Sequence, residues 1–182
     1  MGHDAPQALA QRQFHATAYD LGTVADGDRV TLTALAAGDA DVLGRAFAAM
    51  NPWLAYRTPP DRLAAFLAGE EHDCSRRAIR VAGELAGAIV VRSPWLHGPY
   101  LQFLGLLPGR QAAGVGSAAL AWMEREAPAG TRNLWLCVSA INTRARAFYE
   151  RRGFVATATM DGLAADHMAE ILMRKRLAGD VH

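Results

Sequence analysis

An apolar segment that runs into a glycine-containing loop constrains the fold of this chain most. Residues 100–106 are strongly apolar, and a run of that length predicts a strand buried inside a sheet. Pro108 ends the strand, and Gly114 and Gly116 then open a segment with helical periodicity. Glycine lets the backbone turn sharply and approach a ligand closely, and the start of a helix presents free amides. With Arg110 as an added positive charge, this junction predicts a site for a phosphate or pyrophosphate.

The familiar nucleotide-binding motifs match this junction only in part. Residues 114–119 match the relaxed pattern G-x-G-x-x-A, but that motif needs its first glycine at the end of the strand and an acidic residue about 20 positions later. Here residues 108–113 intervene, and residues 134–139 contain no acid. The Walker pattern fails because no Gly-Lys-Ser/Thr follows the loop. From these residues alone, a domain that binds NAD or ATP and a loop whose glycines serve only packing both stay open.

The remaining periodicity predicts a mixed α/β domain in the order β-α-α-β-β-β-α-β-α-β-β. Alternating or continuous apolar runs predict strands at residues 29–35, 78–82, 85–92, 100–106, 133–138, 154–159 and 169–175. Helices are expected from Asp39, from Thr58, from Gly114 and from Asn142, with Asp39, Thr58 and Asn142 as capping residues. Residues 93–99, which include two prolines and a glycine, are expected to form a loop.

Composition limits what else the chain can be. It has 182 residues, of which 51% are hydrophobic and 20% charged, enough to bury the core of one domain. We expect an N-terminal extension at 1–28, a domain at 29–177 and a tail at 178–182. The net charge of +1 supplies no attraction to nucleic acid or to a membrane surface, and no apolar run reaches the roughly 20 residues of a membrane-spanning helix. The two cysteines form no CxxC and the six histidines lack ligand spacing, so no metal is expected, and a cytoplasmic location is predicted.

Two motifs, in order and on the predicted elements, resemble those of one family. The first is Gln111-x-x-Gly114-x-Gly116 after the buried strand. The second comprises the strand at 134–138 followed by Asn142, Phe148, Tyr149, Gly153 and Phe154. Together they resemble the GNAT superfamily of acyl-CoA-dependent N-acetyltransferases over residues 29–177. The resemblance implies the GNAT fold, an α/β architecture with a mixed, mostly antiparallel central sheet that is splayed at the cofactor site and flanked by helices.

The resemblance also implies a site for acetyl-CoA. Backbone groups at Leu104 and Leu106 would bind the pantetheine arm, and amides of the loop would hold the pyrophosphate. The expected cofactor-binding residues are Leu104, Leu106, Arg110, Gln111, Ala112, Ala113, Gly114, Val115, Gly116, Ser117 and Asn142. Tyr149 is the expected general acid, because a phenol is protonated at neutral pH and can protonate the departing thiolate.

The general base is not evident from the sequence. Many members of the family carry an acid on the strand before the glycine loop, but residues 100–106 contain no carboxylate. Glu84, His97 and the acidic run at 70–73 are the candidates, and His97, just before that strand, ranks first because it is expected to lie nearest the cleft. A chain of water molecules, or an acceptor amine that is already partly neutral, would also suffice.

The resemblance implies an N-acetyltransferase that moves an acetyl group from acetyl-CoA to a primary amine by direct attack. The balanced charge favours a small-molecule acceptor. Two alternatives remain: a CoA-binding sensor or partner-binding protein with little turnover, and an acetyltransferase of protein N-termini or lysines. A homodimer is among the assemblies to expect, since dimers are common in such folds.

Overall fold

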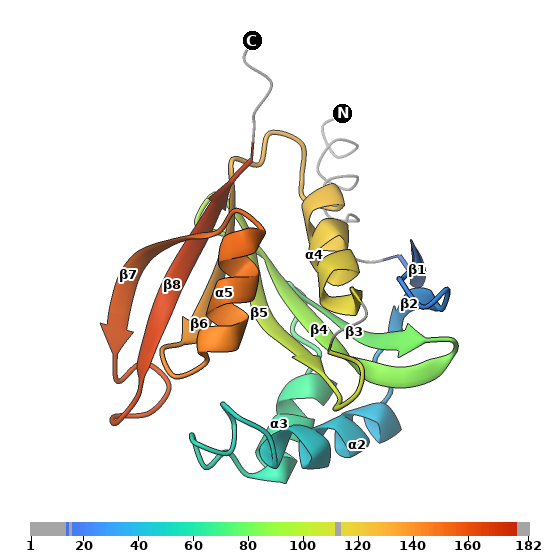
Figure 1. The fold of residues 1–182 in the computed structure, drawn as a ribbon, viewed down its shortest axis with the longest axis horizontal. Coiled ribbons are helices and arrows are strands. Elements are labelled where there is room, and N and C mark those ends of the chain that lie inside the picture. The colour runs from blue at the N-terminus through green and yellow to red at the C-terminus, as the bar shows by residue number, and fades with distance from the viewer. Residues whose placement is uncertain (1–13, 15, 112–113, 178–182) are drawn as a thin grey trace, which may run out of the picture.

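The computed structural model describes residue 14, residues 16–111 and residues 114–177, and eight strands in this part form one sheet (Figure 1). Its order is β1-β2-β3-β4-β5-β6-β8-β7, and every neighbouring pair is antiparallel except β5 and β6. The strands are β1 (Ala18–Thr23), β2 (Arg29–Ala34), β3 (Cys74–Val81), β4 (Glu84–Trp95), β5 (Gly98–Leu106), β6 (Asn133–Ser139), β7 (Val155–Asp161) and β8 (Ala169–Arg176). The helices are α2 (Ala37–Ala48), α3 (Pro60–Ala68), α4 (Val115–Arg125) and α5 (Thr143–Arg151). This mixed, mostly antiparallel sheet with flanking helices confirms the predicted fold class.

The helices cover the sheet from both sides and define two apolar cores (Figure 1). On one face α4 and α5 pack over the centre of the sheet, where Trp122 and Leu136 are fully buried. On the other face α2 and α3 bury Phe47 and Leu67 against Phe103 of β5. Within the described residues, no helix is long and apolar enough to cross a membrane.

A register shift in β5 opens the sheet. Val90 of β4 pairs with Phe103 and Val91 pairs with Leu101, so Gln102 is the extra residue of a β-bulge. On its other side β5 pairs with β6 only at Tyr100 and Leu101. Beyond the bulge the two parallel strands therefore separate, and the edge of β5 that faces β6 has no strand partner from residue 102 to 106. This is the splay that the sequence analysis expected.

The sheet starts earlier than the predicted boundary at residue 28. β1 pairs with β2 through residues 18–23, and Phe14 packs edge-on against Trp122 with ring centroids 5.4 Å apart. The buried Arg77 guanidinium and the Ser75 hydroxyl both donate to the carbonyl of Phe14. The described part of the 1–28 segment is thus integrated into the core and the sheet. The rest of it, and the predicted tail at 178–182, lie outside the described residues.

Several predicted ends differ from the structure. The expected loop at 93–99 is mostly strand, because β4 extends to Trp95 and β5 starts at Gly98. Asp39 does not cap α2, which starts two residues earlier, and its carboxylate instead accepts a hydrogen bond from Arg80 at 2.7 Å. Thr58 does not cap α3, whose N-cap is Pro59. Asn142 caps α5 as predicted, since its Oδ1 accepts from the amide of Ala145.

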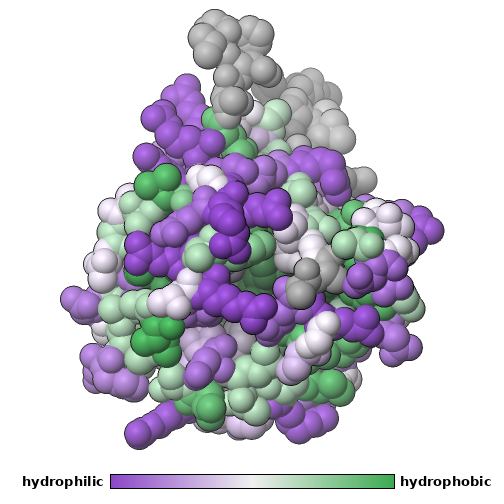
Figure 2. Space-filling model, in the orientation of Figure 1, coloured by the Kyte–Doolittle hydropathy of each residue, from purple (hydrophilic) through white to green (hydrophobic). Residues whose placement is uncertain are grey.

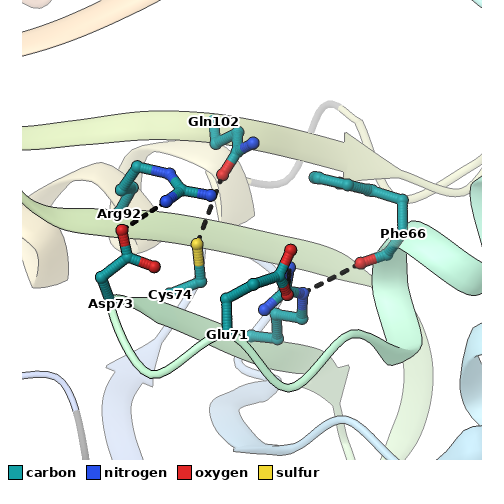
Figure 3. A network of polar contacts seen from close by, with 7 residues as sticks. Phe66, Glu71, Asp73, Cys74, Arg92 and Gln102 are labelled. Atoms are coloured by element: carbon teal, nitrogen blue, oxygen red, sulfur yellow. Dashed lines mark hydrogen bonds and ion pairs between the residues drawn. The ribbon is translucent and has the colours of Figure 1, made fainter.

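A polar network ties the segment before β3 to the sheet (Figure 3). Arg92 is ion-paired with Asp73, and the Cys74 thiol donates to Gln102 Oε1 at 3.5 Å. Arg76 pairs with Glu71 at 2.5 Å, and its Nε donates to the carbonyl of Phe66 in α3, at 2.9 Å. The acidic residues of this network neutralise arginines.

Candidate acetyl-CoA and active site

A cavity of about 670 Å³ lies where β5 and β6 separate, between α4 and α5. Its volume falls within the range of small-molecule sites, about 300–1,000 Å³. Figure 2 shows a hollow in this region of the molecule, with hydrophobic surface at its floor and hydrophilic surface around it. The lining comprises Met50, Asn51, Pro52, Trp53, Leu104, Gly105, Leu106, Gln111, Gly114, Gly116, Ser117, Asn142, Arg144, Ala145, Phe148, Tyr149, Arg151 and Arg152.

The glycines give α4 an open start at the cavity wall. Gly114 is the N-cap residue with φ +84°, a left-handed conformation that costs other residues about 1–2 kcal/mol. A Cβ on Gly116 would lie 3.4 Å from the ring of Phe148, tighter than most contacts. The first-turn amides of a helix have no intrahelical partner, so they are available to an anion. Val115, between these glycines, directs its side chain into the core and is fully buried.

The rim of the cavity is strongly cationic. Arg144 and Arg151 of α5 and its C-cap residue Arg152 line it, and no Asp or Glu is among the described lining residues. Arg144 donates to Gln111 Oε1 at 3.1 Å, and Arg152 donates to the hydroxyl of Ser117. These partners are neutral, so they leave the charge of both guanidiniums uncompensated. A polyanion would be attracted to this rim.

Tyr149 reaches the cavity from α5. Its side chain is 8% exposed and packs against Phe148 and Phe154, with ring centroids 5.3 and 6.0 Å away. Burial raises the pKa of Tyr149 well above the ordinary value of 10, so the phenol stays protonated at neutral pH. Within the described part of the chain, its hydroxyl has no hydrogen-bond partner, which leaves it free to donate to a ligand.

Most predicted cofactor residues lie together at this cavity. Leu104, Leu106, Gln111, Gly114, Gly116, Ser117 and Asn142 line it. Arg110 and Val115 do not line it, and Ala112 and Ala113 lie outside the described residues. Gln111 also closes the loop onto the strand, since its Nε2 donates to the carbonyl of Leu106 at 3.2 Å.

The structure does not bring the predicted bases to the cavity. His97 occupies the exposed turn between β4 and β5, at the start of β5, whereas the cavity is lined by its end. At about 3.3 Å per residue, some 20 Å of strand separate His97 from Leu104. Glu84 is exposed in the β3–β4 turn, and Glu71 and Asp73 are paired with arginines. His97 is close to residues 104–106 along the chain, but the two ends of an extended strand lie far apart in space.

Sequence reasoning also missed residues around the cavity. The α2–α3 loop contributes Met50, Trp53 and the residues between them, and no local motif marks them. Glu170 of β8 is buried but does not line the cavity, and its sequence signal was a single acid inside an apolar run at 169–173. Burial raises the pKa of Glu170 to about 7.

Comparison with known families identifies the domain. The sequence model described as the Acetyltransferase (GNAT) family matches residues 42–154, more than half of the chain. The chain belongs to the GNAT acetyltransferase family. The matched region runs from α2 to the residue before β7 and so includes both sides of the cavity. Among curated proteins, no relative is detected.

Solved structures of acetyltransferases share the fold of this GNAT protein. An acetyltransferase assigned to the GNAT family from Desulfovibrio desulfuricans is 23% identical, with a TM-score of 0.60 over 82% of this chain and 98% of that one. Ard1 from Thermoplasma volcanium is 20% identical, with a TM-score of 0.64 over 82% and 98% of the two chains. Nourseothricin acetyltransferase is 25% identical, with a TM-score of 0.51 over 58% of this chain and 66% of that one.

Proposed function

We propose that this GNAT protein is an N-acetyltransferase that moves the acetyl group of acetyl-CoA to the primary amine of a small molecule. The observation that carries the proposal is the cavity between β5 and β6, which combines a cationic rim, an open helix start and a buried phenol. A long ligand with phosphates at one end and a reactive carbonyl at the other matches this order of features.

The residues of the cavity fit acetyl-CoA in two regions. The amides at Gly114, Gly116 and Ser117, with Arg144 and Arg152, would hold the phosphates. The free edge of β5 at Leu104–Leu106 would accept the amide groups of the pantetheine arm, as a sheet edge accepts an added strand. Asn142 would act mainly through α5, because its side-chain oxygen already caps that helix.

The bound acetyl-CoA supplies a thioester that the acceptor amine attacks directly. Tyr149 would donate its proton to the departing sulfur, a role that its protonated state and unpaired hydroxyl allow. Cys137 is a poor candidate for an acyl carrier, because burial raises the pKa of its thiol and disfavours the thiolate. Positioning of the amine against the thioester would then supply most of the rate acceleration.

Charge and structural similarity favour a small-molecule acceptor. The net charge of +1 provides no extended electrostatic surface for a large partner. The structural neighbour named for nourseothricin has 25% sequence identity and overlaps the same fold.

Titration calorimetry with acetyl-CoA tests the cofactor site first. We expect micromolar binding by the wild type and its loss in Gly114→Glu, which puts a carboxylate at the phosphate site. Gly130→Glu is the matched control, since Gly130 has φ +79°, no atom near its would-be Cβ and a position after the far end of α4. Equal binding by all three proteins would contradict the proposed phosphate site, and no binding by the wild type would overturn the function. Release of CoA thiol in the presence of amines then tests acetyl transfer.

A further inference from the structure

A buried carboxyl lies on the sheet face opposite α4 and α5. Glu170 of β8 is 8% exposed, whereas its neighbour Ile171 points into the core beneath α4 and α5. Because side chains alternate along a strand, Glu170 points away from that core. It pairs across the sheet with Ser139, the last residue of β6. Ser139 is 4% exposed, and its hydroxyl has no hydrogen-bond partner among the described residues, so an unpaired donor lies beside the carboxyl.

Two elements connect this carboxyl to the cavity. The hydroxyl of Tyr56 donates to Glu170 Oε1 from the α2–α3 loop, whose earlier residues 50–53 form part of the cavity lining. On the other side the amide of Asn142, another lining residue, donates to the carbonyl of Ser139. Glu170 is not itself a lining residue, but its neighbours Tyr56 and Ser139 belong to the loop and the strand end that border the cavity.

The phenol of Tyr149 is close to the same face. Tyr100 of β5 lies close to Cys137, which precedes Ser139 by two residues and so shares its side of β6. Burial raises the pKa of Tyr100, Cys137 raises it further, and Tyr149 adds a smaller effect, which places the two phenols within electrostatic range of one another. The opening between β5 and β6 therefore gives the face that carries Glu170 access to the region of Tyr149.

We propose that Glu170 is the general base that takes a proton from the acceptor ammonium. This inference rests on the proposed acetyltransferase function and deepens it. Burial raises the pKa of Glu170 to about 7, which suits a base that must be ionised near neutral pH yet bind a proton readily. Around it the structure places Tyr56 from the loop, Ser139 from β6 and Met160 from β7, so no neighbouring cation among these holds it ionised.

The ammonium gives one proton to the Glu170 carboxylate, and the freed lone pair forms the new carbon–nitrogen bond at the thioester carbonyl. The carbon–sulfur bond breaks, and the sulfur takes the proton of Tyr149. The second proton lost by the acceptor nitrogen restores the Tyr149 hydroxyl, and Glu170 returns its own proton to water.

The test compares wild type with Glu170→Gln, which retains shape and a hydrogen-bond acceptor for Tyr56. Spermidine, an aminoglycoside, free amino acids and a short peptide serve as probe amines, and release of CoA thiol is followed from pH 5.5 to 9. We expect the wild-type kcat/KM to decrease as the pH is lowered through about 7, which gives the pH profile an acidic limb. In Glu170→Gln we expect kcat/KM to drop by about 100-fold or more and the limb to disappear, since a positioned base contributes about 10²–10⁴-fold. Acetyl-CoA binding by calorimetry should change less than twofold.

Two further measurements test the role of Glu170 without relying on Glu170→Gln alone: the pH profile of Tyr56→Phe and a spectroscopic titration. Loss of the donated hydrogen bond should move the acidic limb to higher pH in Tyr56→Phe. Infrared difference spectra of the enzyme without ligand should show a carboxyl that ionises near pH 7 in the wild type and is missing in Glu170→Gln. An unaltered limb in Glu170→Gln, or the absence of such a carboxyl, would overturn the role of Glu170 alone. Failure to bind acetyl-CoA, or binding without turnover of any probe amine, would overturn the proposed function and this inference with it.

Discussion

Replacing Tyr149 by phenylalanine separates catalysis from folding in this protein. The change removes only the hydroxyl and keeps the ring between Phe148 and Phe154. Because that hydroxyl is buried and has no partner among the described residues, its removal costs no hydrogen bond and relieves some desolvation. We therefore expect the free energy of unfolding to change by less than about 1 kcal/mol, which for a chain of this size shifts Tm by no more than about 2–4 °C.

The catalytic loss should be much larger. Proton donation by a positioned side chain contributes about 10²–10⁴-fold, which at 1.36 kcal/mol per factor of ten corresponds to about 3–5 kcal/mol of transition-state stabilisation. That loss should appear in kcat, while the dissociation constant of acetyl-CoA stays within about twofold, because the phosphate-binding residues are untouched.

The assay is steady-state release of CoA thiol with an amine that the wild type acetylates, alongside thermal unfolding. Tyr100→Phe is the matched comparison, since Tyr100 is a partly buried phenol that does not line the cavity. We expect its kcat to stay within about threefold of wild type. A kcat for Tyr149→Phe within threefold of wild type would refute the reasoning, and a larger loss in Tyr100→Phe would assign the donor role to that residue instead.

Three further predictions concern binding, packing and pH. Arg152→Ala should weaken acetyl-CoA binding about 5- to 10-fold and reduce its dependence on salt in calorimetry, whereas Arg146→Ala should not, because Arg146 pairs with a glutamate of α5 and does not line the cavity. Gly44→Ala should lower Tm in calorimetric unfolding by about 2–4 °C for each of the 1–3 kcal/mol lost, because a Cβ there would lie 2.7 Å from a backbone oxygen of α3; Gly38→Ala, with open space in the same helix, should not lower Tm. The pKa of Glu170 is about 7 in the folded state against an ordinary 4.5, so the folded state binds the proton more tightly than the unfolded state does. The stability that this proton contributes is complete below pH 4.5 and is lost as pH rises through 7. Wild type should therefore lose up to about 3 kcal/mol of unfolding free energy between pH 5 and 8 in denaturant titrations, and Glu170→Gln should show a flatter profile.

Local pattern was sufficient for the elements that border the cavity. The apolar run of β5, the glycines that open α4 and the cap at Asn142 each act over a few residues, so their spacing predicted these elements. Element ends were less predictable, since Asp39 bonds with Arg80 from a distant strand where the local pattern suggested a cap.

Contacts between distant segments were beyond the reach of those patterns. β1 belongs to the sheet because it pairs with the edge of β2, although few of its own residues are apolar. The distance of His97 from the cavity and the burial of Glu170 were not predictable for one reason: closeness in space depends on which strands pair.

The sequence by itself determined the family, the order of elements from β2 onward and the glycine-containing junction before α4, because each of these depends on residues that are neighbours along the chain. Only the tertiary structure decided how β5 and β6 separate, which arginines face the cavity and which carboxyl is buried near it. The pairing of β6 with β8 and the path of the α2–α3 loop place Ser139, Tyr56 and Glu170 together across more than a hundred residues. Such an arrangement is set by the packing of the whole domain, which leaves no periodic signal in any one segment.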